Sequence, residues 1–193
     1  AKIEEARGLR DRTISYANTL ATRCAARILA RVHCEATELR RWLDPSREGI
    51  QTGPFGAQLG RDDLVDAGIP LLTIGNIGPG GLRLDSLKYV APDKAATLSR
   101  FLVKQGDILF ARMGTVGRCC VAPPEAEGYL INYHIIRIAL DRSRADPRFV
   151  NWTIRASQDV AKYLEGTIRG ATREGVNSAI VGSLPCRIPS LEE

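Results

Sequence analysis

The feature that constrains this chain most is an uninterrupted helical pattern over residues 2 to 32. Apolar or small side chains recur there in steps of three, four or five, as a period of 3.6 residues produces. This stripe consists of Ile3, Ala6, Leu9, Ile14, Ala17, Leu20, Cys24, Ile28 and Val32, and arginines occupy the opposite face. A helix of this length extends for about 45 Å and cannot bury its stripe alone. We expect the stripe to pack against a partner helix or, alternatively, against the rest of this chain.

The sequence changes character after residue 33. Glycines and prolines interrupt residues 45 to 60, which indicates a structured loop. We expect strands at 69–77, 87–90, 101–104, 108–111, 118–121, 129–140 and 184–189, and helices at 92–100 and 147–164. The segments 101–104 and 108–111 flank Gln105-Gly106-Asp107 and are predicted to form a hairpin. The fold class is therefore α+β: a long N-terminal helix over residues 1–33, suited to dimerisation or a coiled coil, then a domain over 34–193 built on a mixed, irregular β-sheet with short helices.

The charge is modest but consists mainly of arginine. The chain carries 27 Lys and Arg against 22 Asp and Glu, a net charge of +5. Arginine suits bidentate contacts with phosphate and guanine. An arginine-rich composition also follows from G+C-rich coding, so charge alone does not decide between a DNA-binding protein and other classes.

Cysteine, histidine and hydropathy patterns exclude several other classes. The five cysteines show no C-x-x-C spacing, and the two histidines have no ligand pattern, so we expect no disulfide framework and no metal site. The sequence has no apolar run long enough to cross a bilayer and no signal peptide, which favours a reduced, cytoplasmic protein. Both ends look like cuts in a longer protein.

Motifs for catalysis are missing, so we expect a non-catalytic protein. The chain has no G-x-x-x-x-G-K-(S/T) loop and no G-x-G-x-x-G after a strand. We interpret His134 as a core-strand residue whose hydrogen bonds are satisfied within the protein. We interpret Cys119 and Cys120 as strand residues that pack in the core and do not act as nucleophiles. The strongest enzymatic alternative is a self-processing or serine–lysine peptidase-like β-fold, because Gly106-Asp107-Ile108-Leu109 forms the turn that such folds use. However, only Lys162 follows Lys104, so the base required by that chemistry is missing.

Four segments, in order along the chain, resemble a known family. Thr52-Gly53-Pro54-Phe55-Gly56-Ala57-Gln58-Leu59 is similar to the T-G-P-F-G-(S/T)-x-L loop of type I restriction–modification specificity subunits. Residues 106–118 resemble that family's G-D-I-L-x-x-R-x-G-(S/T)-x-G-(R/K) stretch, and 166–193 its glycine-rich loop, short helix and I-P-containing strand, with Ser190 where a proline is usual. Residues 2–10 look like its spacer helix.

The resemblance implies a target-recognition domain (34–193) with its spacer helix (1–33), reading one half of a split site in double-stranded DNA. Its partners would be a DNA methyltransferase subunit, a restriction/translocase subunit, and a second recognition domain or a second copy paired through the N-terminal helix. This chain would need no cofactor, because S-adenosylmethionine and ATP would belong to partner subunits. A recognition module of another methyltransferase or phage-defence complex remains the alternative.

Candidate DNA contacts come from the glycine-rich loops, where backbone approaches phosphate closely and side chains can reach base edges. They are Gln51, Thr52, Phe55, Gln58, Arg112, Thr115, Arg118, Asn132, Arg169, Thr172, Arg173 and Asn177. Five glycines are expected to shape the backbone of these loops: Gly53, Gly56, Gly114, Gly117 and Gly170. Phe55 has a second interpretation, as a plug of the core beneath its loop, and Arg112 and Arg118 could instead be solvated charges at strand ends.

Overall fold

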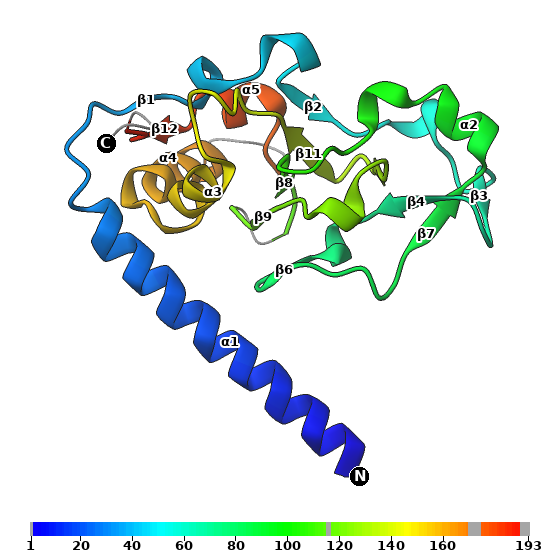
Figure 1. The fold of residues 1–193 in the computed structure, drawn as a ribbon, viewed down its shortest axis with the longest axis horizontal. Coiled ribbons are helices and arrows are strands. Elements are labelled where there is room, and N and C mark those ends of the chain that lie inside the picture. Colours follow the sequence, from blue (N-terminus) through cyan, green and yellow to red (C-terminus); the bar gives the residue numbers. More distant parts are fainter. Residues whose placement is uncertain (1, 115–116, 170–174, 190–193) are drawn as a thin grey trace.

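The chain begins with one long helix that extends away from a body of short strands and helices (Figure 1). The computed structural model describes residues 2–114, 117–169 and 175–189. Helix α1 spans Lys2–Leu29, so it ends three residues before the expected end of the pattern. Among the described residues, no helix is both long and apolar enough to cross a lipid bilayer.

The central sheet positions most of the candidate residues. It is antiparallel, in the order β2 (Ile50–Thr52), β11 (Ile135–Ile138), β8 (Ile108–Ala111), β9 (Cys119–Val121). Side chains alternate between its faces, as the period of a strand requires. Ile108 and Phe110 enter one hydrophobic cluster, whereas Leu109 and Ala111 enter the other. The sheet therefore separates two cores, and its two inner strands, β8 and β11, are buried on both faces.

A second sheet lies beyond one of these cores. Its order is β10 (Leu130–Ile131), β4 (Ile69–Leu72), β7 (Lys88–Val90), β3 (Leu64–Val65), with β10 and β4 parallel and the other pairs antiparallel. Two small ladders complete the strand pairing: β5 (Ile77–Gly78) with β6 (Gly81–Leu82), and β1 (Thr37–Glu38) with β12 (Pro185–Cys186).

Helices cover the other core. They are α3 (Pro147–Ala156), α4 (Gln158–Arg169) and α5 (Ser178–Gly182), while the short α2 (Pro92–Ala96) belongs to the second-sheet side. Helix α3 begins as its sequence predicts, because the Asp146 side chain accepts hydrogen bonds from the backbone N–H groups of Arg148 and Phe149, with Pro147 in the first turn. The expected α+β class, with a long N-terminal helix before an irregular mixed sheet, is confirmed.

The predicted hairpin between 101–104 and 108–111 is wrong. Residues 99–101 form a 3-10 turn, and β8 pairs with β11 and β9 instead. The backbone of Val103 exchanges hydrogen bonds with Tyr129 and Gly128, and Leu102 forms an isolated bridge to Leu130. Residues 101–104 therefore lie against the segment before β10, because Phe101 and Val103 are buried in the core on that side of the central sheet.

Two long predicted elements are each divided in two. The expected strand 129–140 turns between β10 and β11, where the Asn132 carbonyl accepts from Ile135 N–H and the Asn132 side chain accepts from His134 N–H. The expected helix 147–164 breaks at Ser157, whose backbone is extended between α3 and α4. His134 consequently lies in a turn and is half-buried, not in a core strand as expected.

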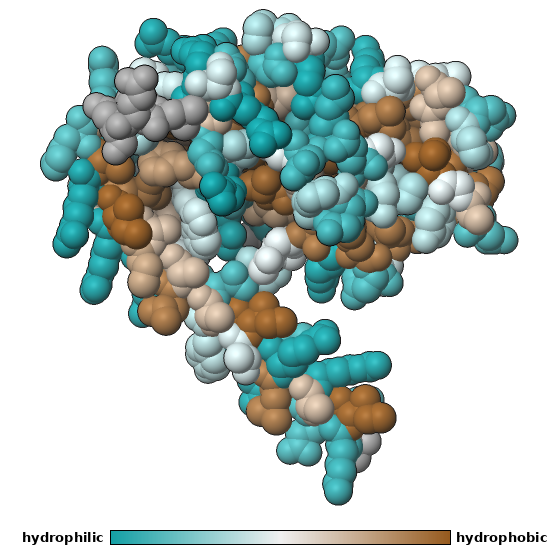
Figure 2. Space-filling model, in the orientation of Figure 1, coloured by the Kyte–Doolittle hydropathy of each residue, from teal (hydrophilic) through white to brown (hydrophobic). Residues whose placement is uncertain are grey.

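Helix α1 meets the body through a face other than the predicted stripe. Its half-buried side chains near α3 include Ala21, Ala25 and Leu29, and they lie on one side of the helix. Val32, which follows the end of α1, is half-buried, and the other eight residues of the stripe are exposed: Ile3, Ala6, Leu9, Ile14, Ala17, Leu20, Cys24 and Ile28. Figure 2 shows hydrophobic residues along the surface of this helix. The stripe is thus not buried against this chain.

Candidate nucleic-acid interface

Most of the described candidate residues lie at one edge of the central sheet, formed by the ends of its strands. The pairing register of the strands brings three loops together there. β2 ends at Thr52, opposite Ile136, and β8 ends at Ala111, opposite Ile135, where β11 begins. The loop after β2, the β8–β9 connection and the turn before β11 therefore emerge side by side. Three segments that are separate in the sequence therefore form one surface.

Arg112 ties these loops together. Its Nε donates to the Val176 carbonyl at 3.2 Å, and its Nη1 donates to the Tyr133 carbonyl at 3.3 Å. Its guanidinium carbon lies 5.4 Å from the centroid of the Phe55 ring, within cation–π range. Backbone hydrogen bonds join Arg112 to His134 and Val176 as well. This side chain thus holds the loops in place, and its contact with DNA stays a prediction.

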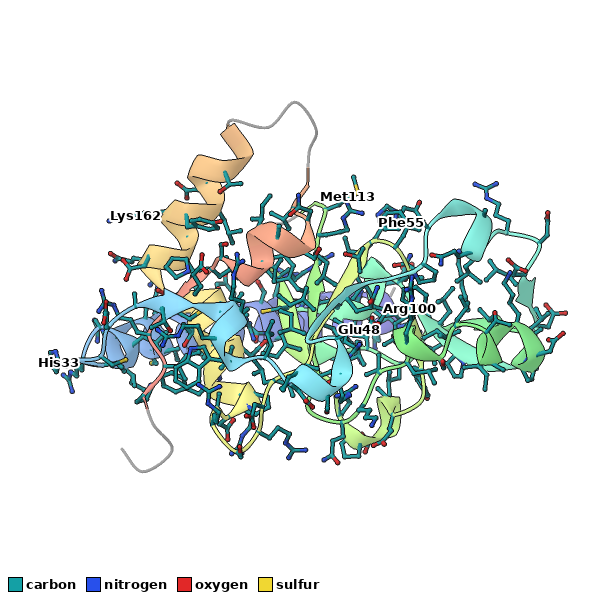
Figure 3. All side chains as sticks on the ribbon, turned by 90° about the horizontal axis from the view of Figure 1, so that it is seen from above. His33, Glu48, Phe55, Arg100, Met113 and Lys162 are labelled. Carbon is teal, nitrogen blue, oxygen red and sulfur yellow. The ribbon has the colours of Figure 1, made fainter. Side chains whose placement is uncertain are left out.

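Two aromatic side chains project from this edge. Phe55 is 52% exposed and Tyr133 is 42% exposed, and their ring centroids are 6.2 Å apart. The Tyr133 ring also lies 3.8 Å from the imidazole of His134, whose Nδ1 is 3.2 Å from the sulfur of Met113. In the view of Figure 3, Phe55 and Met113 lie near each other on one side of the molecule. Because Phe55 is exposed, it does not plug the core.

The surroundings of His134 favour its neutral form. Burial lowers its pKa below the ordinary value of 6.5, and the nearby positive charge of Arg112 lowers it further. A neutral imidazole can donate from one nitrogen and accept at the other.

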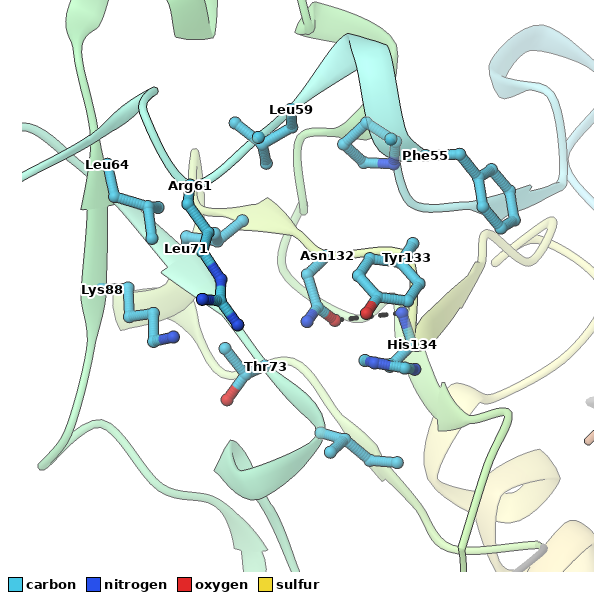
Figure 4. A pocket seen from close by; sticks show the side chains of 14 residues that line it. Phe55, Leu59, Arg61, Leu64, Leu71, Thr73, Lys88, Asn132, Tyr133 and His134 are labelled. Carbon is cyan, nitrogen blue, oxygen red and sulfur yellow. Dashed lines mark hydrogen bonds between the residues drawn. The ribbon is translucent and has the colours of Figure 1, made fainter.

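A pocket of about 580 Å³ opens beside these rings. Leu59, Leu64 and Leu71 contribute apolar walls, and Thr73 and Asn132 contribute polar groups. Figure 4 shows the side chain of Arg61 pointing into this space, with the Lys88 amine nearby. The pocket thus combines an apolar lining, exposed aromatic rings and two cations, which can hold a polyanion that carries flat, hydrogen-bonding groups.

A second hollow of about 350 Å³ lies on the other side of Phe55. Its lining includes Gln51, Thr52, Gln58 and Arg100. The Gln51 amide donates to the carbonyl of Thr52, and the Gln58 side-chain oxygen accepts from Phe55 N–H at 3.4 Å. Phe55 is therefore a ridge between two hollows, and every predicted residue from 51 to 58 lines one or both.

The remaining predicted contacts are placed differently. Arg118 is half-buried and donates to the Ile74 carbonyl, and its Nε has no partner among the described residues. It is therefore not a solvated strand-end charge, and its contact with DNA stays a prediction. Asn177 caps α5 by accepting from Ile180 N–H, close to Val176 and the Arg112 loop. Thr115, Gly170, Thr172 and Arg173 lie outside the described residues, as does the side chain of Arg169.

The requirement for glycine at position 53 is steric. A Cβ atom at this position would lie 2.2 Å from the Asn132 carbonyl oxygen, so only glycine lets the loop after β2 pack on the turn before β11. Gly56, Gly114 and Gly117 have positive φ angles of 39°, 75° and 82°.

Sequence reasoning missed Tyr133, Arg61 and Lys88. Arg61 stands three residues beyond Gln58 in the same glycine-rich region, so extending the loop would have included it. Tyr133 directly follows the predicted Asn132, so extending that turn by one residue would have included it. Nothing local marks Lys88, because the pairing of β7 in the second sheet brings it to the pocket. The thiols of Cys119 and Cys120 are buried on opposite faces of β9, as predicted, and burial raises the pKa of Cys120 to about 12.

Comparison with protein-family models and with characterised sequences finds no match. Solved structures do match. A chain from a study of complex assembly and conformational transition in a type I restriction–modification system aligns with a TM-score of 0.61 and 16% identity, over 99% of this chain and 44% of the other. The HsdS subunit from Thermoanaerobacter tengcongensis aligns with a TM-score of 0.59, at the same identity and coverage.

The S subunit of a type I system from M. genitalium also aligns, with a TM-score of 0.51 and 13% identity over 95% of this chain and 42% of the other. This chain therefore has the fold of type I specificity subunits, as the four sequence segments led us to expect. It spans less than half the length of the structures it matches.

Proposed function

We propose that this chain recognises one half of a bipartite sequence in double-stranded DNA, as a non-catalytic part of a type I restriction–modification specificity subunit. The observation that carries this proposal is the shared fold over nearly the whole chain. The loops that resemble the family in sequence also meet at one edge of the sheet, around the exposed Phe55.

Two groups of side chains at this edge would contact the DNA, one at its phosphates and the other at its bases. Arg61 and Lys88 would contact phosphates, which position the protein without carrying sequence information. The amides of Gln51, Gln58 and Asn132 would reach base edges, where a side-chain amide pairs well with adenine. Phe55 and Tyr133 offer apolar surface for a thymine methyl group or a deoxyribose.

The proposed organisation follows the division into a helix (1–33) and a recognition domain (34–193). Since the matched chains are more than twice as long, this chain corresponds to one such unit. Its exposed stripe on α1 would pair with a second spacer helix, from another recognition domain or a second copy. A methyltransferase subunit and a restriction/translocase subunit would complete the complex and bring S-adenosylmethionine and ATP.

Selection of binders from a randomised duplex library tests the proposal. We expect the wild-type chain at moderate salt to enrich a short motif of about three to five base pairs, and a Phe55→Ala, Tyr133→Ala double variant to lose that enrichment. Uniform, salt-sensitive retention of all duplexes would indicate electrostatic binding alone. The selection would then be repeated with the methyltransferase subunit of the same system present, and a second failure to enrich any motif would overturn the proposal.

A further inference from the structure

Arg137 is a buried cation whose hydrogen bonds are incomplete. It lies on β11 with only 3% of its side chain exposed. Its Nη2 donates to the carbonyls of Arg47 and Arg100, both at 3.2 Å. Its Nε and Nη1 have no hydrogen-bond partner among the described residues. An unpaired buried N–H group is costly, and more so on a charged side chain, so this guanidinium has capacity for a further acceptor.

The nearest carboxylate is already shared. Asp107 accepts from Arg47 at both oxygens, at 2.7 and 3.0 Å, and from the backbone N–H of Lys104 at 2.8 Å. The Arg137 Nη1 atom lies 3.8 Å from Asp107 Oδ2, which is beyond hydrogen-bond distance. One buried carboxylate therefore faces two guanidinium groups, so these three side chains together retain a positive charge.

Arg137 lines a pocket of about 300 Å³ that is rich in cations. Arg47, Arg100 and Lys104 line it too, together with the hydroxyl-bearing Ser46 and Ser99. Among the described residues that line it, Glu48 alone carries a carboxylate, and its φ of 45° is unusual for a residue other than glycine. Figure 3 shows Glu48 beside Arg100 in this part of the molecule. With Asp107 beneath the pocket, and Asp44, whose charge interacts with those of Arg47, Lys104 and Arg137, four cations face three carboxylates.

We propose that this pocket binds a phosphate group, with the exposed Arg100 as its principal donor and the buried Arg137 supplying positive charge beneath it. Planar guanidinium groups donate in pairs to phosphate oxygens, and the excess positive charge favours an oxyanion over a neutral ligand. The presence of Glu48 favours a singly charged phosphodiester over a dianionic phosphate. Because Arg100 also lines the hollow beside Phe55, a phosphodiester of DNA lying across Phe55 is the source that the geometry favours.

Thermal unfolding of the full chain, titrated with inorganic phosphate against sodium chloride at equal ionic strength, tests the site itself. We expect phosphate to raise the unfolding midpoint with a saturable dependence. Arg100→Ala removes an exposed donor and should weaken phosphate binding roughly tenfold. Glu48→Gln should strengthen it several-fold, and Arg31→Ala, an exposed arginine outside the pocket, should leave it unchanged. Equal midpoints in phosphate and chloride, or an unaltered affinity in Arg100→Ala, would overturn the proposal.

Duplex DNA then identifies the source of the phosphate. If it is the DNA backbone, a duplex displaces inorganic phosphate, and Arg100→Ala lowers the slope of log K against log salt by about one. If phosphate binds but a duplex neither displaces it nor responds to Arg100→Ala, the site takes a free phosphate and the DNA assignment is wrong. The site does not depend on the proposed function: sequence-specific DNA binding without any phosphate response would reject the pocket alone.

Discussion

The guanidinium carbon of Arg112 lies 5.4 Å from the ring centroid of Phe55, and the same side chain donates to backbone carbonyls at Tyr133 and Val176. One charged group thus links the β2 loop, the turn before β11 and the segment before α5. The exposed ring of Phe55 is thereby held between two hollows. The placement of these loops depends on two N–H donors of one planar guanidinium group, a geometry that a lysine ammonium group does not supply.

Arg112→Lys should therefore lower the free energy of unfolding by about 1–2 kcal/mol, because lysine keeps the charge but loses the paired donation to Val176 and Tyr133. Chemical denaturation of both proteins measures this change. Arg148→Lys, at an exposed ion pair with Asp146, is the matched control and should change stability much less. Equal losses in the two variants would contradict the linking role of Arg112.

Gly53→Ala should lower the free energy of unfolding by about 1–3 kcal/mol, since the new Cβ would meet the Asn132 carbonyl at 2.2 Å and force the loop from the turn. The control is Gly166→Ala on α4, where an added Cβ meets nothing within 4 Å. Alanine favours a helix over glycine, so this variant should be neutral or more stable by about 0.5–1 kcal/mol. If denaturant unfolding showed a larger loss of stability for Gly166→Ala than for Gly53→Ala, the steric explanation would be refuted.

Arg61→Ala and Lys88→Ala should each weaken binding to all duplexes by a similar factor. If each side chain meets one phosphate, the slope of log K against log salt should fall by about one per variant. Binding titrations between low and physiological salt, on a selected duplex and on an unrelated one, measure both effects. Arg31→Ala is the control for the loss of one positive charge. If the salt slope of Arg31→Ala fell as much as the slopes of Arg61→Ala and Lys88→Ala, the pocket would have no specific role.

The exposed stripe on α1 should support pairing between helices. A Leu20→Gln, Ile28→Gln double variant removes two side chains that are 64% and 63% exposed, so it should leave the fold intact while weakening self-association. Sedimentation velocity over a wide concentration range measures this, with Arg27→Gln on the same helix as the control. A wild-type chain that stays monomeric at the highest concentration would refute pairing between copies of this fragment.

His134 should make stability fall on mild acidification. Its folded pKa lies below 6.5, so the unfolded chain takes up the proton first as the pH drops. Its contribution is complete above about pH 6.5 and is lost progressively as the pH falls towards the folded value. Denaturation midpoints between pH 7.5 and 5.5 should decline less in His134→Gln than in wild type. His33→Gln, outside the loop cluster, should keep the wild-type decline, and identical profiles in all three proteins would exclude this role.

Elements with a strong local signal were predictable from the sequence. The periodic stripe indicates α1, Asp146-Pro147 indicates the start of α3, and the central strands β8 and β9 lie where apolar runs predict them. These features depend on backbone propensity, capping and turn chemistry, which act over a few residues. The residues from 51 to 58 were also identified locally, because a glycine-rich loop is marked by its own composition.

Tertiary structure decided which residues share a surface. Strand register placed Tyr133 beside Phe55 and brought Arg61 and Lys88 into one pocket, although no local pattern relates these positions. It also made Arg112 a link between loops, buried Arg137 beside a shared carboxylate, and set α1 against the body through a face other than its stripe. The physical reason is that these outcomes depend on pairing between segments far apart in the chain, whereas the sequence by itself determines the local elements that are brought together.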